Sequence, residues 1–170
     1  MTVHVQHWFH PDKPEIKADA LMLLFGSVVA LAGAYIYAFA IEFMPFVYLN
    51  PAFCAFFGIG IAHGIASAGR IAKAHSPTMQ FAVGSFCGIL GWYASWALGI
   101  GYITDTMSFA PTYVAQQAIF LSHAGNWSLF GYVPTGNALY FFWWFEALLI
   151  ISISAFVPHA LLNRKSDNIK

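Results

Sequence analysis

Two ionisable side chains lie within long apolar stretches of the sequence. Residues 52–69 contain one such side chain, His63, and residues 138–157 contain one, Glu146. At a rise of about 1.5 Å per helical residue, His63 lies about 16 Å and Glu146 about 12 Å from the start of its stretch. Their similar depth suggests a proton-sharing pair or a polar point on a pathway. The alternative is a neutral Glu146 that bonds to a carbonyl or hydroxyl group and stabilises the fold.

Two further carboxylates stand at the ends of apolar stretches. Glu42 follows the stretch 20–41, and Asp105 follows the stretch 81–103. Together with Glu146 they would form an acidic opening without basic residues, and such openings favour cations. The alternative is that Glu42 and Asp105 are ordinary solvated acids. The candidates for a transport pathway are therefore Glu146, His63, Glu42 and Asp105.

Other reactive residues show no pattern that indicates catalysis. His4, His7 and His10 recur every third residue, but a proline follows and no cysteine or clustered carboxylate accompanies them. Cys54 and Cys87 lie in different apolar stretches and are expected to be packing residues. The sequence has no phosphate-binding glycine loop, HExxH motif or nucleophile elbow. We therefore expect no enzymatic activity, no catalytic residue, no metal and no cofactor.

Small residues recur at helical spacing in the second and third apolar stretches. The positions with this spacing that we assign to helix packing are Gly60, Gly64, Gly84, Gly88 and Gly91. Small residues let helix backbones approach closely, which holds helices together in lipid. In one interpretation the two stretches pack against each other. In the other, one of the two faces contacts a second copy of the chain.

The composition predicts that helices position these residues within a membrane. Of 170 residues, 59% are hydrophobic and 8% are charged, whereas a soluble domain carries roughly 25% charged residues. Spans of about 20 apolar residues cross a bilayer as helices. A soluble helical bundle would instead require a polar face on each helix. We expect one membrane domain over residues 1–170, with spans at about 20–44, 52–72, 79–103 and 138–162.

The basic residues predict the orientation of the spans. All seven would fall on one side of a four-span topology, at Lys13, Lys17, Arg70, Lys73, Arg164, Lys165 and Lys170. Basic residues accumulate in cytoplasmic loops, so both termini are expected in the cytoplasm and the protein in the inner membrane. The span 20–44 is too long for the core of a cleavable signal peptide and is expected to be retained.

The outer connection, residues 104–137, is too long to be a simple link. Pro111 is typical of a helix start, and Gly125 of a helix end. We therefore expect a short helix over residues 112–123. The aromatic residues in this connection favour an interfacial or re-entrant position for the helix.

Several short motifs resemble those of known sequences. They are Pro45-Phe46-Val47-Tyr48-Leu49-Asn50, Phe57-Gly58-Ile59-Gly60, Tyr93-Ala94-Ser95-Trp96 and Trp144-Phe145-Glu146-Ala147-Leu148-Leu149-Ile150. On these motifs the chain resembles a family of uncharacterised bacterial multi-span integral membrane proteins. The family has no established activity, so the resemblance implies topology alone.

Two functions follow as hypotheses from these patterns. The first is a small homo-oligomeric pore or transport component for ions or protons, with His63 and Glu146 on the pathway. The second is a non-catalytic membrane subunit or assembly protein that docks a partner. The expected partners are the lipid bilayer and either a second copy of the chain or another membrane protein. Because the formal net charge is zero, nucleic acid is not expected as a partner.

Overall fold

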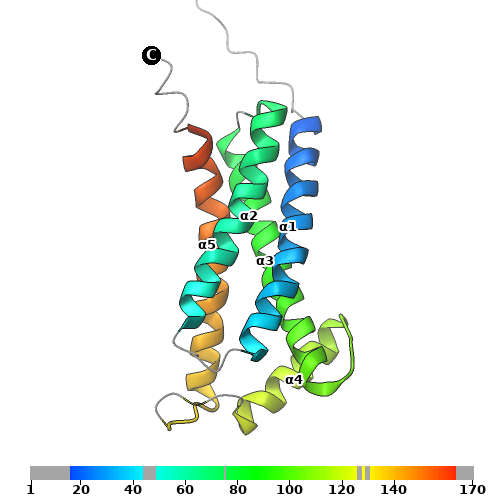
Figure 1. The fold of residues 1–170 in the computed structure, drawn as a ribbon, viewed down its shortest axis with the longest axis vertical. Coiled ribbons are helices and arrows are strands. Elements are labelled where there is room, and N and C mark those ends of the chain that lie inside the picture. The colour runs from blue at the N-terminus through cyan, green and yellow to red at the C-terminus, as the bar shows by residue number, and fades with distance from the viewer. Residues whose placement is uncertain (1–15, 44–48, 75, 126–127, 129–130, 164–170) are drawn as a thin grey trace, which may run out of the picture.

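The structure, a computed structural model, describes residues 16–43, 49–74, 76–125, 128 and 131–163. These residues form five helices (Figure 1): α1 Ile16–Phe43, α2 Asn50–Ala72, α3 Pro77–Thr104, α4 Pro111–Ala124 and α5 Asn137–Asn163. The all-helical class expected from the sequence is confirmed for this part of the chain. The histidines at positions 4, 7 and 10 lie outside the described residues.

Four of these helices are long and apolar enough to cross a membrane. They are α1, α2, α3 and α5, and each contains an 18-residue window of high hydropathy with few charged residues. The prediction of four apolar helical spans is thus confirmed, and the chain is a multi-pass membrane protein. The shorter α4 lies in the connection between α3 and α5.

Local sequence signals explain where the helices begin and end. Ser76 caps α3 by accepting a hydrogen bond from the Met79 backbone N–H at 3.4 Å, and a proline occupies the first turn. Lys73 ends α2 in the left-handed conformation (φ 56°), and the next N–H bonds back to the Gly69 carbonyl at 2.9 Å. Gly125 ends α4 with φ 70°. The turn between α2 and α3 is consequently tight.

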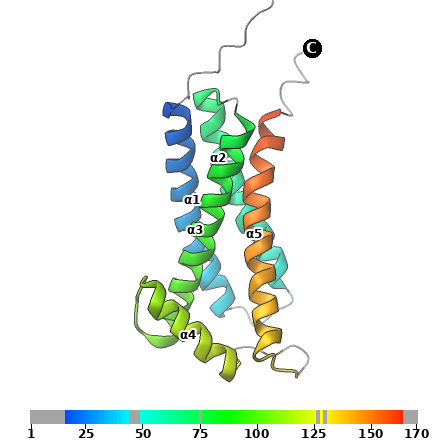
Figure 2. The same cartoon turned by 180° about the vertical axis from the view of Figure 1, so that it is seen from behind.

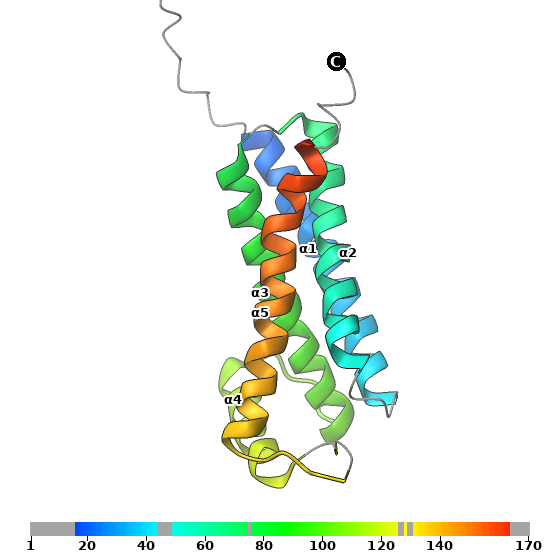
Figure 3. The ribbon, with the colours of Figure 1, turned by 90° about the vertical axis from the view of Figure 1, so that its left-hand side faces the viewer.

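The four long helices form an antiparallel bundle in which α1 and α5 each pack against both α2 and α3. Although α2 and α3 are joined by a short turn, they contact each other little and lie on a diagonal of the bundle (Figure 3). The interpretation in which these two spans pack on each other therefore holds only in part: Gly91 of α3 lies against Phe57 of α2, but both helices pack chiefly on α1 and α5. Every long helix is apolar around its whole circumference, so the sequence did not reveal which face meets which neighbour.

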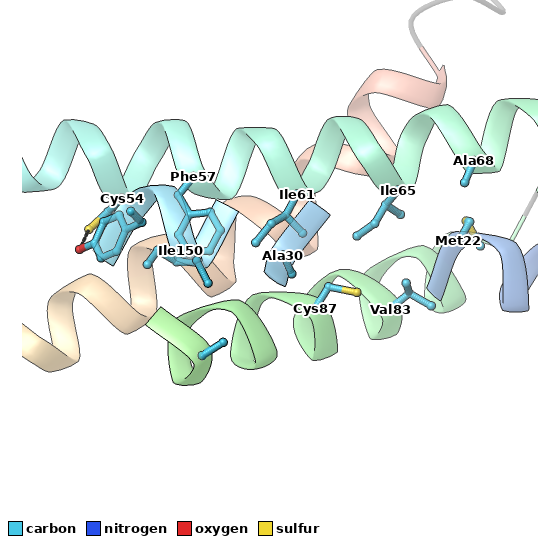
Figure 4. Packing of buried hydrophobic residues seen from close by; sticks show 13 residues of the cluster. Met22, Ala30, Cys54, Phe57, Ile61, Ile65, Ala68, Val83, Cys87 and Ile150 are labelled. Atoms are coloured by element: carbon cyan, nitrogen blue, oxygen red, sulfur yellow. Dashed lines mark hydrogen bonds between the residues drawn. The ribbon is translucent and has the colours of Figure 1, made fainter. Parts of the chain in front are cut away.

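The bundle is held together by a core of small and branched apolar side chains (Figure 4). Its fully buried members include Met22 from α1, Ile61 and Ile65 from α2, and Ile150 from α5. A second cluster, around Ala97, Ile100, Val114, Leu121, Leu139 and Trp143, joins α3, α4 and α5. These clusters fill the described space between the helices.

The outward surface of the long helices is apolar as well. Large side chains such as Ile36 on α1 and Phe56 on α2 are 67% and 72% exposed. A soluble domain rarely exposes contiguous apolar patches this extensive. Lipid solvates such side chains, so the bundle contacts the bilayer over its outer surface.

The connections alternate between the two ends of the bundle. The start of α1, the turn between α2 and α3, and the end of α5 lie together at one end (Figure 1). At the opposite end α4 lies across the base of the bundle, beside α3 and α5 (Figure 2). The functional candidates are distributed between this α4 end and the middle of the bundle.

Candidate functional site

Glu146 takes part in a hydrogen-bonded cluster that joins three helices. It lies in the first half of α5 and is partly buried. The side-chain amide of Asn50, the first residue of α2, donates a hydrogen bond to Glu146 Oε1. The carboxyl group therefore has a neutral partner from the neighbouring helix. This contact matches the alternative in which Glu146 stabilises the fold, although its partner is an amide.

Tyr37 and Cys54 extend this cluster to α1. The Tyr37 hydroxyl donates to Asn50 Oδ1 at 2.7 Å and lies 3.2 Å from Cys54 Sγ. The Cys54 thiol in turn lies 3.7 Å from Asn50 Oδ1. The Tyr37 ring stacks on Phe57 with 5.5 Å between the ring centroids. We call Tyr37, Asn50, Cys54 and Glu146 the polar cluster.

The polar cluster satisfies hydrogen-bonding groups that lipid cannot satisfy. The side-chain amide N–H of Asn50 donates to Glu146, and its Oδ1 accepts from the Tyr37 hydroxyl, so both ends of the amide are hydrogen-bonded. An amide or carboxyl group left unpaired in an apolar environment is costly. The cluster therefore fixes the positions of α1, α2 and α5 relative to one another near the start of α2.

His63 lies away from this cluster. It is thirteen residues beyond Asn50 along α2, which is about 20 Å of helix, and its side chain is exposed on the outer surface of the bundle. Its Nδ1 lies 3.1 Å from the Ile59 carbonyl oxygen. The structure therefore does not bring His63 and Glu146 together, and the proposed proton-sharing pair is absent within one chain.

Glu42 and Asp105 are both exposed at the α4 end of the bundle. Glu42 is the penultimate residue of α1, and Asp105 caps α3 in the left-handed conformation with φ 53°. Glu146 is instead partly buried against Asn50. The three carboxylates share the half of the bundle that includes α4, but Glu146 differs from the other two in its environment.

The five glycines assigned to packing occupy four different environments. Gly84 and Gly88 lie against the backbone of α5, where an added Cβ would overlap Ser154 atoms. Gly64 faces α1, since a Cβ there would lie 2.8 Å from Val29, and Gly91 faces Phe57 of α2 at 2.9 Å. Gly60 is exposed, and an added Cβ would meet nothing within 4 Å. Contacts within the chain therefore use four of these glycines and leave Gly60 open.

The described residues contain no group of three or more histidine, cysteine, aspartate or glutamate side chains that could hold a metal ion. Cys54 and Cys87 are both free and buried. Cys54 belongs to the polar cluster, and the Cys87 Sγ lies 3.9 Å from the Ser27 hydroxyl between α3 and α1. Their surroundings are those of packing residues.

Sequence reasoning missed two members of the polar cluster, Asn50 and Tyr37. The sequence pattern gave neither residue a role. One signal was present: Asn50 and Cys54 are four residues apart and so share a helical face. That spacing alone does not identify a partner on another helix.

No family model, curated protein or solved structure matches this chain. The resemblance to uncharacterised bacterial multi-span proteins therefore stays an expectation. The four apolar helices support the coarser statement that the chain is a membrane-type protein.

Proposed function

We propose that the protein is a non-catalytic, homo-oligomeric membrane component whose copies associate through the outer face of α2. The observation that carries this proposal is the exposed His63 in the middle of a membrane-spanning helix, beside the open Gly60. Ser67 continues the same face, because residues 60, 63 and 67 are three and four apart. We call Gly60, His63 and Ser67 the α2 face.

A histidine in contact with hydrocarbon is unfavourable unless its ring nitrogens have partners. A backbone carbonyl accepts hydrogen bonds and cannot donate them, so the contact with Ile59 assigns the proton to Nδ1. Nε2 is then an acceptor without a proton, on a side chain exposed at the surface of the bundle. Polar groups at this depth usually face protein or water. A second polypeptide over the α2 face would remove this cost.

The α2 face suits a second copy of the same chain. Gly60 leaves room for close approach of a helix backbone, as small residues do at membrane helix contacts. His63 supplies an acceptor, and the Ser67 hydroxyl, which accepts a hydrogen bond from Arg70 at 3.0 Å, keeps its own proton for donation. Two copies inserted in the same orientation hold these groups at matching depths in the bilayer. A two-fold axis along the membrane normal would therefore bring the α2 face of one copy against the α2 face of the other.

Substitutions on the α2 face should weaken association without unfolding the bundle. We expect Gly60→Leu to abolish dimers, because its side chain would separate the two backbones. His63→Leu removes two symmetry-related interhelical hydrogen bonds, one from each copy, and should weaken association about 8-fold or more. Energy transfer between labelled copies in liposomes, measured over a range of protein-to-lipid ratios, reports both effects.

The matched control for these substitutions is Ala32→Leu, which also enlarges an exposed small residue in the middle of a span. It should leave energy transfer unchanged. Equal energy transfer in wild type and Gly60→Leu would refute association through the α2 face. Co-purification of a different protein in fixed stoichiometry would mean that this protein, and not a second copy of the chain, covers the α2 face.

We also propose that the protein lies in the inner membrane with both termini in the cytoplasm. Lys17, Arg70 and Lys73, the basic residues within the described ranges, lie at the end of the bundle away from α4. The positive-inside tendency assigns that end to the cytoplasm. The α4 end then faces outward, with α4 itself at the membrane interface.

Reporter fusions test this orientation. Fusions after Lys73 and after Lys170 should give a cytoplasmic signal, and a fusion within residues 124–136 should give an external one. The reason is that basic residues resist translocation across the membrane. A cytoplasmic signal from residues 124–136 would contradict the proposed orientation.

A second candidate function is an ion or proton transport component built from several copies. The observation that favours it is that His63, an ionisable side chain, is exposed on the face where copies would meet. The described interior of one chain is mostly apolar, and the polar cluster lies near the start of α2 alone, so a pathway would run between copies. Proton flux in liposomes that is lost in His63→Leu but kept in Ala32→Leu would favour this function over a purely structural one.

A further inference from the structure

Arg70 continues the α2 face toward the end of the bundle away from α4. It lies three residues beyond Ser67 and seven beyond His63, so the three residues share one side of the helix. The Arg70 side chain is exposed and belongs to the last turn of α2. The α2 face therefore carries a cation at the end of the bundle that we assign to the cytoplasm.

The Arg70 side chain is turned back toward the middle of the membrane. Its Nη2 donates to Ser67 Oγ at 3.0 Å, and Ser67 lies about 7.5 Å before the last residue of α2. Side chains tilt toward the N-terminus of their helix, and α2 begins at the α4 end of the bundle (Figure 1). Long basic side chains near helix ends otherwise extend to the polar interface. The guanidinium is therefore held at the border of the hydrocarbon.

No carboxylate in the described part of the chain neutralises this charge. Among the described residues, the Arg70 side chain makes its polar contact with Ser67, whose hydroxyl is neutral. The described carboxylate at this end of the bundle is Asp19, in the first turn of α1, and it forms no ion pair with Arg70. A guanidinium group has five N–H donors and stays charged at physiological pH. The remaining donors of Arg70 are thus available to an anion from outside the chain.

Association of two copies through the α2 face brings two of these cations together. A two-fold axis along the membrane normal holds the two Arg70 side chains at the same depth, where like charges near a low-dielectric medium repel. Membrane helices cross at an angle. Two α2 helices in contact at Gly60, about 15 Å along the helix from Arg70, therefore diverge toward the cytoplasmic end. This divergence leaves space for a lipid headgroup between the two Arg70 side chains.

We propose that the associated copies bind an anionic phospholipid at the cytoplasmic end of the α2 face, with its phosphate between the two Arg70 side chains. This site rests on the proposed function, because it needs two copies joined through the α2 face. Guanidinium N–H groups pair with phosphate oxygens, and basic sites between helices on the cytoplasmic side bind anionic headgroups. A lipid fits better than free phosphate because apolar side chains such as Ile71, which is 71% exposed, solvate its acyl chains. The bound lipid removes the repulsion and stabilises the association.

Energy transfer between labelled copies in vesicles of two compositions tests the lipid site. One vesicle contains phosphatidylcholine alone, and the other contains equal amounts of phosphatidylcholine and phosphatidylglycerol. The strength of association is read from the protein-to-lipid ratio at half-maximal energy transfer. We expect the wild type to associate more tightly in the anionic mixture, by about 5-fold or more, because an anionic lipid interacts favourably with each basic side chain near the surface.

Two substitutions separate Arg70 from the general attraction of basic residues to an anionic surface. Arg70→Gln removes the charge and keeps a polar side chain, so it should lose the preference for the anionic mixture. In phosphatidylcholine alone it should associate at least as tightly as wild type, because the repulsion between the two copies is gone. Lys17→Gln is the matched control, since it removes an exposed basic side chain of α1 at the same end of the bundle. This control should keep the preference.

Four results would overturn the lipid site. Equal association of wild type in both compositions, above the level of Gly60→Leu, would remove the lipid and leave the association through the α2 face intact. Energy transfer no higher than that of Gly60→Leu in both compositions would refute the association, and the lipid site with it. A preference that Arg70→Gln keeps, or that Lys17→Gln also loses, would assign the effect to general surface charge. Inorganic phosphate that strengthens association in phosphatidylcholine as much as phosphatidylglycerol does would assign the site to a free anion.

Discussion

Replacement of Gly84 by leucine is expected to abolish the folded bundle, whereas leucine at Gly99 should leave its stability nearly unchanged. A Cβ at Gly84 would overlap the Ser154 carbonyl oxygen and lie 2.8 Å from the Ala155 Cα. Both are backbone atoms of α5, which cannot turn aside as a side chain can. A Cβ at Gly99 would meet nothing within 4 Å.

The close approach at Gly84 has a specific cause in α5. Pro158 lies inside this helix and has no N–H, so the carbonyl of Ser154, four residues earlier, loses its usual helical partner. The Ser154 hydroxyl turns back to the Ile150 carbonyl at 2.8 Å. Gly84 allows the α3 backbone to lie directly against the Ser154 carbonyl that lacks its helical partner. Any larger residue at this position would separate α3 from α5.

Thermal unfolding in detergent, followed by the loss of the monodisperse peak in size-exclusion chromatography, measures this effect. Gly88→Leu should behave like Gly84→Leu, because its Cβ would overlap the Ser154 side chain and lie 3.0 Å from the Ile151 Cα. The conservative change Ile89→Leu, at an exposed position, is a second control. Equal stability of the Gly84 and Gly99 variants would mean that α3 and α5 do not pack as described.

The second large effect is expected at Glu146. Replacement by leucine removes the acceptor of the Asn50 amide and leaves a polar group unpaired between α2 and α5. An unsatisfied buried donor costs about 1 to 3 kcal/mol. Glu146→Leu should therefore destabilise the bundle by about this amount. Glu146→Gln keeps an oxygen that can accept the same hydrogen bond, so its stability should stay close to that of wild type.

The Gln variant also separates a structural role of Glu146 from a transport role. Thermal stability and liposome flux are measured on the same preparation. If the polar cluster only joins the helices, Glu146→Gln preserves stability and every activity that wild type shows. Loss of flux with unchanged stability would instead place Glu146 on a transport pathway. A Leu variant as stable as wild type would contradict the structural role of the Asn50 hydrogen bond.

The sequence predicted the helical class and the four spans because these depend on the length of apolar runs. A run such as residues 20–41 must form internal backbone hydrogen bonds in lipid, wherever its side chains point. Turn chemistry likewise predicted a helix start at Pro111. These features are local, so a single sequence is sufficient to find them.

Which helices become neighbours, and which residues form the polar cluster, depends on how each helix is rotated about its own axis. The apolar sequences of these helices do not show that rotation. In a soluble bundle the polar face of a helix reveals its orientation, but α2 and α3 have none. The sequence therefore did not reveal that α2 and α3 pack chiefly on α1 and α5. The His63–Glu146 pair failed for a different reason. Counting from the start of each apolar stretch put the two side chains at similar depth, whereas Glu146 contacts Asn50 at the start of α2 and His63 lies about 20 Å further along that helix.

The native mass of the protein shows whether copies associate through the α2 face. The protein is excised from its membrane in polymer-bounded nanodiscs that retain the surrounding lipid, and its mass is compared with that of Gly60→Leu. We expect a dimer of this chain for wild type and a single, folded chain for Gly60→Leu. A wild-type protein that is a single chain, or a Gly60→Leu variant that keeps the wild-type oligomer, would contradict it.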